Sequence, residues 1–147
     1  MRMLMQLSQN LQIELESLYP ALFANKNPMN SCMNRGCCIG DGWFALFARL
    51  CAQVQARVTQ AKSPQPVLIQ VKEKFGSLRV YWRGADDYVR ELTELAETKS
   101  LQTCEACGEA GGLIREDGSN LRVRCELHKT CRPKTSTHSP KSQSAAT

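Results

Sequence analysis

Cys104-Glu-Ala-Cys107-Gly108 and Cys125-Glu-Leu-His128 set the structure expected for the C-terminal part of this chain. The two segments leave 17 residues between Cys107 and Cys125. The two pairs have the C-x2-C and C-x2-H spacing of a tetrahedral zinc site. In a C-x2-C knuckle both thiolates point to one side of a tight turn, and the glycine that follows lets the backbone fold beneath the metal. The stretch therefore predicts a zinc site with Cys104, Cys107, Cys125 and His128 as ligands.

The residues between the two pairs predict a hairpin. Leu113-Ile-Arg115 and Leu121-Arg-Val-Arg124 can pair across Asp117-Gly-Ser-Asn120, a strong turn sequence. A short helix from Cys125 to Cys131 is expected next. A knuckle, a hairpin and a helix in this order are typical of a treble-clef finger, which we expect over residues 101–131.

The fourth ligand stays open, because on a helix Cys131 lies three residues after His128 and can replace it. A catalytic zinc keeps one position free for water. Here more than four side chains can bind the metal, which favours a closed, structural site.

The cysteine content also admits a disulfide framework or a redox pair, since the chain has eight cysteines in 147 residues. Its start, Met1-Arg-Met-Leu-Met-Gln6, lacks the apolar segment of a secretory signal, so we expect a reducing cytoplasm. In that compartment cysteine pairs more often hold metal or do chemistry. A redox C-x2-C needs a thioredoxin-like βαβ setting, which the sequence around Cys104 does not predict.

Composition limits the class of protein. The length fits one ordinary domain or a small domain with a finger, and 42% hydrophobic residues can build a modest core. No stretch approaches the roughly 20 apolar residues of a membrane span, so we expect a soluble protein without a membrane partner. The net charge is +5, but Arg132, Lys134 and Lys141 carry three of these charges and leave about +2 for the rest. That balance is low for a strongly basic nucleic-acid binder.

The end of the chain, residues 132–147, is rich in Ser, Thr and Pro and has no large apolar residue. Such a segment cannot bury enough surface to offset the loss of chain entropy. We expect a disordered basic tail there.

Residues 1–100 predict an α+β domain in which helices pack on a small antiparallel sheet. Leucines at steps of three and four predict an amphipathic helix over residues 4–19, and a loop follows over 25–40. Asp41 is the expected N-cap of a second helix that runs to Ala61. The apolar residues on one face of that helix are Trp43, Phe47, Leu50, Cys51, Val54 and Val58.

The clearest β signal is a hairpin of residues 67–73 and 77–83 around Lys74-Phe-Gly76. Alternation places three apolar residues on one face of each strand: Val67, Ile69 and Val71, then Leu78, Val80 and Trp82. Asp86 and Asp87 can cap a third helix that runs to Ser100. Its expected inward residues are Val89, Leu92, Leu95 and Ala96.

The opposite face of this hairpin is the best candidate for a binding surface, because it combines cations with aromatic rings as single-strand nucleic-acid surfaces do. Its expected members are Lys72, Lys74, Arg79, Tyr81 and Arg83, with Phe75 at the tip. The finger hairpin adds Arg115, Arg122 and Arg124. The alternative is an ordinary polar face whose charge is balanced by the next helix through Asp86, Asp87, Glu91 and Glu94.

Two further sites are weaker alternatives. Cys32, Cys37 and Cys38 can be part of a second metal site, although C-x4-C-C is not a standard ligand spacing and no histidine lies near them. Asp41 with Gln70 and Lys72 resembles the acid and Gln-x-Lys arrangement of metal-dependent nucleases. Asp41 fits a helix cap better than a metal ligand.

Three motifs follow one another in a distinctive order: Gly40-Asp-Gly-Trp-Phe44, Gln70-Val-Lys-Glu-Lys-Phe-Gly-Ser-Leu-Arg-Val-Tyr81 and Cys104-Glu-Ala-Cys-Gly108. Together with Tyr19-Pro-Ala-Leu-Phe23 they resemble a family of small, largely uncharacterised proteins of tailed phages and prophages. The resemblance covers about residues 15–128 and implies a mobile-element origin and a bacterial cytoplasm, but no activity. The chain departs from the family at Cys37-Cys38-Ile39 and at Leu121–Arg124, where relatives often have aromatic residues.

These patterns favour a non-catalytic, zinc-binding accessory protein of a phage or prophage that binds nucleic acid through the basic hairpin and the finger. The alternative is an inhibitor or adaptor that binds a host protein, such as a bacterial defence complex of the kind that anti-CRISPR proteins block. A metal-dependent nuclease is the third hypothesis. Few side chains favour an enzyme, since no free histidine in the structured part and no pair of carboxylates in an apolar setting offers acid–base catalysis.

Overall fold

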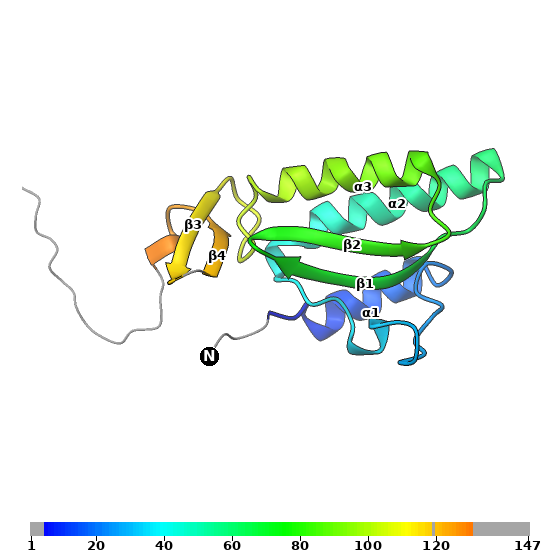
Figure 1. Ribbon diagram of the computed structural model, residues 1–147, viewed down its shortest axis with the longest axis horizontal. Helices are drawn as coiled ribbons and strands as arrows, with labels where there is room; N and C mark the ends of the chain where they lie inside the picture. The colour runs from blue at the N-terminus through cyan, green and yellow to red at the C-terminus, as the bar shows by residue number, and fades with distance from the viewer. Residues whose placement is uncertain (1–4, 119, 131–147) are drawn as a thin grey trace, which may run out of the picture.

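The structure, a computed structural model, describes residues 5–118 and 120–130. Within them the expected α+β class is confirmed, with three helices and two separate two-stranded antiparallel sheets (Figure 1). The helices are α1 (Gln9–Leu18), α2 (Phe44–Ala61) and α3 (Asp87–Ser100). The sheets are the hairpins β1 (Val67–Lys74) with β2 (Ser77–Arg83), and β3 (Gly112–Asp117) with β4 (Asn120–Arg124). Single 3₁₀ turns lie at Met33–Arg35, Asp41–Trp43 and His128–Thr130.

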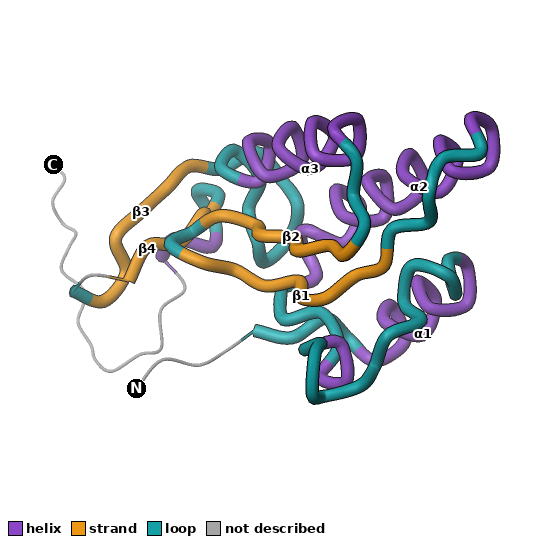
Figure 2. Tube along the Cα trace, turned by 45° about the vertical axis from the view of Figure 1, so that its right-hand side comes forward, coloured by secondary structure: helices purple, strands orange, loops and turns teal. Residues whose placement is uncertain are grey.

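The β1–β2 hairpin lies between two sets of helices. Figures 1 and 2 show α2 and α3 on the β2 side of the hairpin and α1 beside β1. One apolar core joins them, and Trp43 and Phe47 at the start of α2 are completely buried in it. The predicted apolar face of α2 is therefore confirmed from Trp43 to Val54, and Cys51 is one of its buried members.

Both edges of the β1–β2 hairpin are covered by hydrogen bonds. On the β1 edge, the backbone N–H groups of Cys32 and Cys38 donate to the carbonyl oxygens of Ile69 and Val71 at 2.7 and 2.9 Å. On the β2 edge, Leu78 N–H donates to Ser100 Oγ at 2.9 Å. A two-stranded sheet is marginal by itself, and open edges invite pairing with other chains, so these contacts stabilise and protect the hairpin.

A β-bulge corrects the predicted faces of β1. Leu68 lies opposite Trp82 but Gln70 lies opposite Tyr81, so Ile69 is an extra residue that interrupts the alternation. The prediction that Val67, Ile69 and Val71 share a buried face is therefore wrong, and Leu68 and Val71 are buried instead.

Asp86 caps α3 as expected, because its carboxylate accepts a hydrogen bond from Val89 N–H at 3.0 Å. Asp41 does not cap α2, which begins three residues later at Phe44. Its carboxylate accepts hydrogen bonds from the backbone N–H of Ser8, at 2.8 Å, and from the Ser8 hydroxyl. Asp41 thus ties the segment before α1 to the start of α2.

Two smaller expectations also need correction. Leu95 is 62% exposed, so it does not face the core with Val89 and Ala96. Helix α1 begins at Gln9 rather than Leu4, and its last residue, Leu18, is 60% exposed. The predicted tail over 132–147 lies outside the described residues, as does Cys131. Among the described residues, no helix combines the length and the apolar composition that a membrane crossing needs.

Candidate metal centre

A tight turn presents the first cysteine pair. Cys104 N–H donates to the carbonyl oxygen of Glu109, and Gly108 N–H donates to that of Cys104, both at 2.8 Å. Gly108 has a φ of +87°, a left-handed conformation that an L side chain rarely adopts. The glycine after the second cysteine therefore closes the knuckle, as its place in the sequence predicts.

The β3–β4 hairpin returns the chain to this turn. Gly112 pairs with Arg124, so Cys125 follows directly at the end of β4. Lys129 N–H donates to the carbonyl oxygen of Cys125 at 3.0 Å, which folds the segment carrying His128 back over the cysteine. The predicted helix from Cys125 is a single 3₁₀ turn, His128–Thr130, in the described part of the chain.

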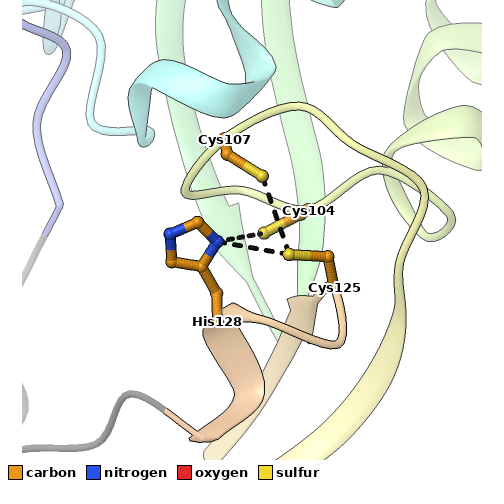
Figure 3. A group of neighbouring side chains, drawn as sticks. All are labelled: Cys104, Cys107, Cys125 and His128. Atoms are coloured by element: carbon orange, nitrogen blue, oxygen red, sulfur yellow. Dashed lines mark hydrogen bonds between the residues drawn. The ribbon is translucent and has the colours of Figure 1, made fainter.

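The four predicted ligands lie together, and their ligand atoms are all within 4.8 Å of one another (Figure 3). Cys107 Sγ is 3.7 Å from Cys125 Sγ. His128 Nδ1 is 3.2 Å from Cys125 Sγ and 3.8 Å from Cys104 Sγ. Cys104 and Cys125 are buried, whereas Cys107 is exposed. This group of three thiols and one imidazole can hold a metal ion.

The backbone around Cys104 favours the thiolate, the form that binds metal. Burial by itself would raise the pKa of the Cys104 thiol. Hydrogen bonds from the backbone N–H groups of Cys125, Cys107 and Ala106 outweigh burial, so the pKa lies below its usual value. Of the two knuckle thiols, Cys104 therefore ionises more readily, since the pKa of Cys107 is raised.

The knuckle packs against residues 40–43, which lead into α2. Gly42 N–H donates to the carbonyl oxygen of Glu105 at 2.8 Å, and Gly40 N–H donates to the Glu105 carboxylate at 3.0 Å. Trp43 Nε1 donates to the carbonyl oxygen of Thr103 at 2.8 Å. The Gly-Asp-Gly-Trp motif thus leads into α2 and also forms the hydrogen bonds that fix the knuckle, which carries Cys104 and Cys107.

A buried ionic cluster lies behind the knuckle. Arg122 is 4% exposed, and its guanidinium lies 3.3 Å from the Glu105 carboxylate and 3.4 Å from that of Glu73. Arg124, whose side chain is 11% exposed, lies 3.8 Å from the same Glu105 carboxylate. Burial raises the pKa of Glu105 above its usual value and outweighs the Gly40 N–H and the Arg122 and Arg124 charges, which lower it.

The prediction that Arg122 and Arg124 add to an exposed basic surface is therefore wrong. Only Arg115 of the three finger arginines is exposed. Sequence reasoning missed Glu105 and Glu73 because each lies between residues with stronger signals: the knuckle cysteines for Glu105 and two lysines for Glu73.

The outer face of the β1–β2 hairpin collects the other predicted binding residues. Lys72 lies opposite Arg79, Gln70 opposite Tyr81, and Val67 opposite Arg83, so these cations and the Tyr81 ring share one face. The Lys72 ammonium is 5.7 Å from the centre of the Tyr81 ring. At the hairpin tip, the Lys74 ammonium is 5.7 Å from the centre of the Phe75 ring. We call Lys72, Lys74, Arg79, Tyr81 and Arg83 the hairpin face.

The four cations of the hairpin face form no ion pair within residues 5–118 and 120–130. Two helix acids expected to balance them have other partners: Asp86 lies 3.6 Å from Arg57, and Asp87 lies 3.1 Å from Arg90. Arg79 is near enough to Glu97 for its charge to lower the pKa of that carboxyl, although burial dominates and the pKa is raised.

The loop cysteines do not form a second metal group in the described part of the chain, where only the Cys104 group brings three or more metal-binding side chains together. Burial raises the pKa of Cys37 to about 12 and raises that of Cys51 well above the usual value. Both therefore remain protonated thiols in the apolar core.

Comparison with known proteins gave no match: no family model, no curated protein and no solved structure matches this chain.

Proposed function

We propose that the chain is a non-catalytic, zinc-binding accessory protein of a phage or prophage that binds nucleic acid through the hairpin face. The observation that carries this proposal is a set of four cations on one side of a braced hairpin, none of them in an ion pair with a described residue. The resemblance of its motifs to phage proteins supports the origin.

Zinc is the metal that fits the group best. Zinc bonds of about 2.3 Å to sulfur and about 2.0–2.1 Å to nitrogen at tetrahedral angles place two sulfurs about 3.8 Å apart, and a sulfur and a nitrogen about 3.6 Å apart. The distances of 3.7 Å between the Cys107 and Cys125 sulfurs and of 3.8 Å from His128 Nδ1 to the Cys104 sulfur are close to these values, and the distance of 3.2 Å from His128 Nδ1 to the Cys125 sulfur is shorter. Three thiolates with one imidazole form a closed, structural set. Knuckle, hairpin and His128 follow the order of a treble-clef-like finger.

The hairpin face supports nucleic acid as the partner. Phosphate neutralisation by Lys and Arg supplies most of the affinity of such proteins. Because Arg122 is buried and the Arg124 side chain is only 11% exposed, the finger surface contributes Arg115 alone, and the binding role rests on the β1–β2 hairpin. A local patch also agrees with the small net charge, since one face can be basic on a chain that is nearly balanced elsewhere.

The first test counts zinc per chain by native mass spectrometry and measures oligonucleotide affinity against salt. Four phosphate contacts predict that log K falls against log salt with a slope of about −3 for single strands. Arg79→Glu should weaken binding and flatten the slope. Arg90→Glu is the matched control, because it makes the same charge change on α3, where Arg90 pairs with Asp87. Affinity that ignores salt and both reversals would overturn the nucleic-acid proposal.

An inhibitor or adaptor that binds a host protein is the second candidate, and one observation favours it. A mainly apolar groove with a cavity of about 130 Å³ lies between α2 and α3, and its lining includes four leucines: Leu46, Leu50, Leu92 and Leu95. Leu95 is 62% exposed there, so the groove offers a side chain that a protein partner can bury. A pull-down from nuclease-treated bacterial lysate tests this candidate with Leu95→Lys as the control; a bound protein that both forms retain would exclude the groove.

A further inference from the structure

We propose that the nucleic acid on the hairpin face is single-stranded, with bases stacked on Phe75 at the hairpin tip and on Tyr81 on the strand. This inference rests on the proposed function, because it assigns the class of nucleic acid and two residues that contact its bases. Its support is the conformation of Phe75, the bracing of the tip and the order of rings and cations along the hairpin.

Phe75 has a backbone conformation that is unusual for a bulky residue. It has a φ of +55° and precedes Gly76 at +84°, so the two residues make the turn between β1 and β2. Such two-residue turns need positive φ at both positions and favour Asn, Asp or Gly, whereas a bulky residue is an outlier there. Phe75 is 64% exposed, so burial offsets little of this strain. Strained residues of this kind cluster at binding and active sites.

The tip is braced from behind. The Glu73 carboxylate accepts a hydrogen bond from Gly76 N–H at 2.7 Å, and it lies 3.4 Å from the buried guanidinium of Arg122 on β4. A Cβ atom on Gly76 would lie 2.4 Å from the Leu113 side chain, so the β3–β4 hairpin packs directly against the turn. The exposed ring therefore stands on a supported turn, which lowers the ordering cost of binding.

Along the hairpin, three cations, Lys74, Lys72 and Arg79, lie between the rings of Phe75 and Tyr81. Phe75 and Lys74 lie at the tip, Lys72 and Arg79 form the next pair on the hairpin face, and Tyr81 follows with 39% of its surface exposed. Ser77, the first residue of β2 after the tip, and Tyr81 are about 13 Å apart along β2 at about 3.3 Å per residue. Single-strand binding surfaces combine the same two elements: cations for the phosphates and rings for the bases.

A duplex fits this surface less well. Bases expose their faces for stacking only when they leave a paired helix. A two-stranded ribbon can enter the major groove of DNA. Here, however, the segment from Cys32 to Cys38 covers the β1 edge and α3 covers the β2 edge, so the hairpin is not a free ribbon. A hairpin with covered edges and one exposed face can instead bind a single nucleic-acid strand that lies across that face.

The test compares a single-stranded oligonucleotide of about 12 nucleotides with its duplex, as DNA and as RNA, by fluorescence anisotropy on the zinc-loaded full chain. We expect the single strand to bind at least 10-fold more tightly. Phe75→Asn is the decisive variant, because asparagine suits the turn: it should raise the melting temperature and weaken single-strand binding at least 5-fold. Tyr81→Leu should weaken binding similarly, whereas Tyr81→Phe keeps the ring and should bind like the parent.

The outcomes separate the two proposals. Equal or tighter duplex binding, or unchanged single-strand binding by Phe75→Asn and Tyr81→Leu, would overturn the single-strand inference and leave the salt-dependent binding of the hairpin face intact. If the parent protein showed no salt-dependent binding to either the single strand or the duplex, the proposed function would be overturned as well. DNA and RNA arms that differ would identify which single strand the surface prefers.

Discussion

Replacement of Gly42 by alanine should show how tightly the metal group and the helical part are joined. A Cβ atom on Gly42 would lie 2.2 Å from the carbonyl oxygen of Cys104 and 2.6 Å from the backbone nitrogen of Cys107. The carbonyl oxygen would have to move by about 1.2 Å to reach an ordinary contact of 3.4 Å. Both atoms belong to the backbone of predicted ligands, so no flexible side chain can absorb the shift.

The expected cost follows from this geometry. Overpacking of a well-packed site destabilises a protein by about 1–3 kcal/mol, and two backbone contacts place Gly42→Ala at about 3 kcal/mol. If the knuckle shifts instead of the helix start, the same strain appears as zinc affinity weakened by up to about 150-fold. Gly112→Ala is the control, because a Cβ atom there meets nothing within 4 Å. We expect that control to be neutral or stabilising by about 0.5 kcal/mol.

Urea denaturation at saturating zinc measures the first quantity, and competition with a chromophoric chelator measures the second. Loss of stability or of zinc affinity in Gly42→Ala, but not in Gly112→Ala, agrees with a knuckle docked on the start of α2. If Gly42→Ala and Gly112→Ala were equal in both measurements, that docking would not exist in solution.

The remaining predictions concern the metal group and the buried carboxylates. Cys125→Ser should reduce bound zinc from one to none in native mass spectra and increase hydrogen exchange in β3 and β4, since metal binding and local folding are linked; unchanged zinc would refute the ligand role. Arg122→Met leaves two carboxylates buried without this cation and should cost about 3–5 kcal/mol of unfolding free energy, whereas exposed Arg115→Met should stay within about 0.5 kcal/mol. Burial raises the pKa of Glu97, so the stability that its protonated form contributes is present below the usual value of 4.5 and is lost as pH rises through the raised pKa. Glu97→Gln should therefore gain stability relative to the parent as the pH rises from 4.5 through the raised pKa in urea titrations, and parallel pH profiles would contradict this.

Much of the fold followed from local patterns. The Asp86 cap, the turn at Lys74-Phe-Gly76 and the apolar face of α2 use interactions between near neighbours, so sequence spacing was enough to place them. The prediction of which β1 residues face the core was wrong because Ile69 is a bulged residue that shifts the alternation. The amino-acid composition around Ile69 gives no signal of this bulge. The prediction that Asp41 caps α2 was wrong because its hydrogen-bond partner, Ser8, lies 33 residues away in the sequence.

The candidate site shows the same division. The spacing of Cys104, Cys107, Cys125 and His128 was sufficient to predict that four metal-binding side chains meet, because a knuckle and a hairpin are short-range structures. The positions of the hairpin face were also predictable, because side chains alternate regularly between the two faces along β2 and along β1 from Gln70 to Lys74. The burial of Arg122 was not predictable, because arginine is rarely buried without a partner and its partners come from two distant segments.

Local sequence patterns were enough to predict the class of the fold, the four grouped metal-binding side chains and the cationic strand positions, because each depends on residues a few positions apart. Three features became visible only in the packed chain. The Gly-Asp-Gly-Trp motif hydrogen-bonds to the knuckle, and buried Arg122 pairs with Glu73 and Glu105. Glu73 in turn accepts a hydrogen bond from the turn that carries Phe75. The physical reason is that burial and charge pairing depend on which distant segments approach one another. A one-dimensional pattern does not contain that information until the chain has packed.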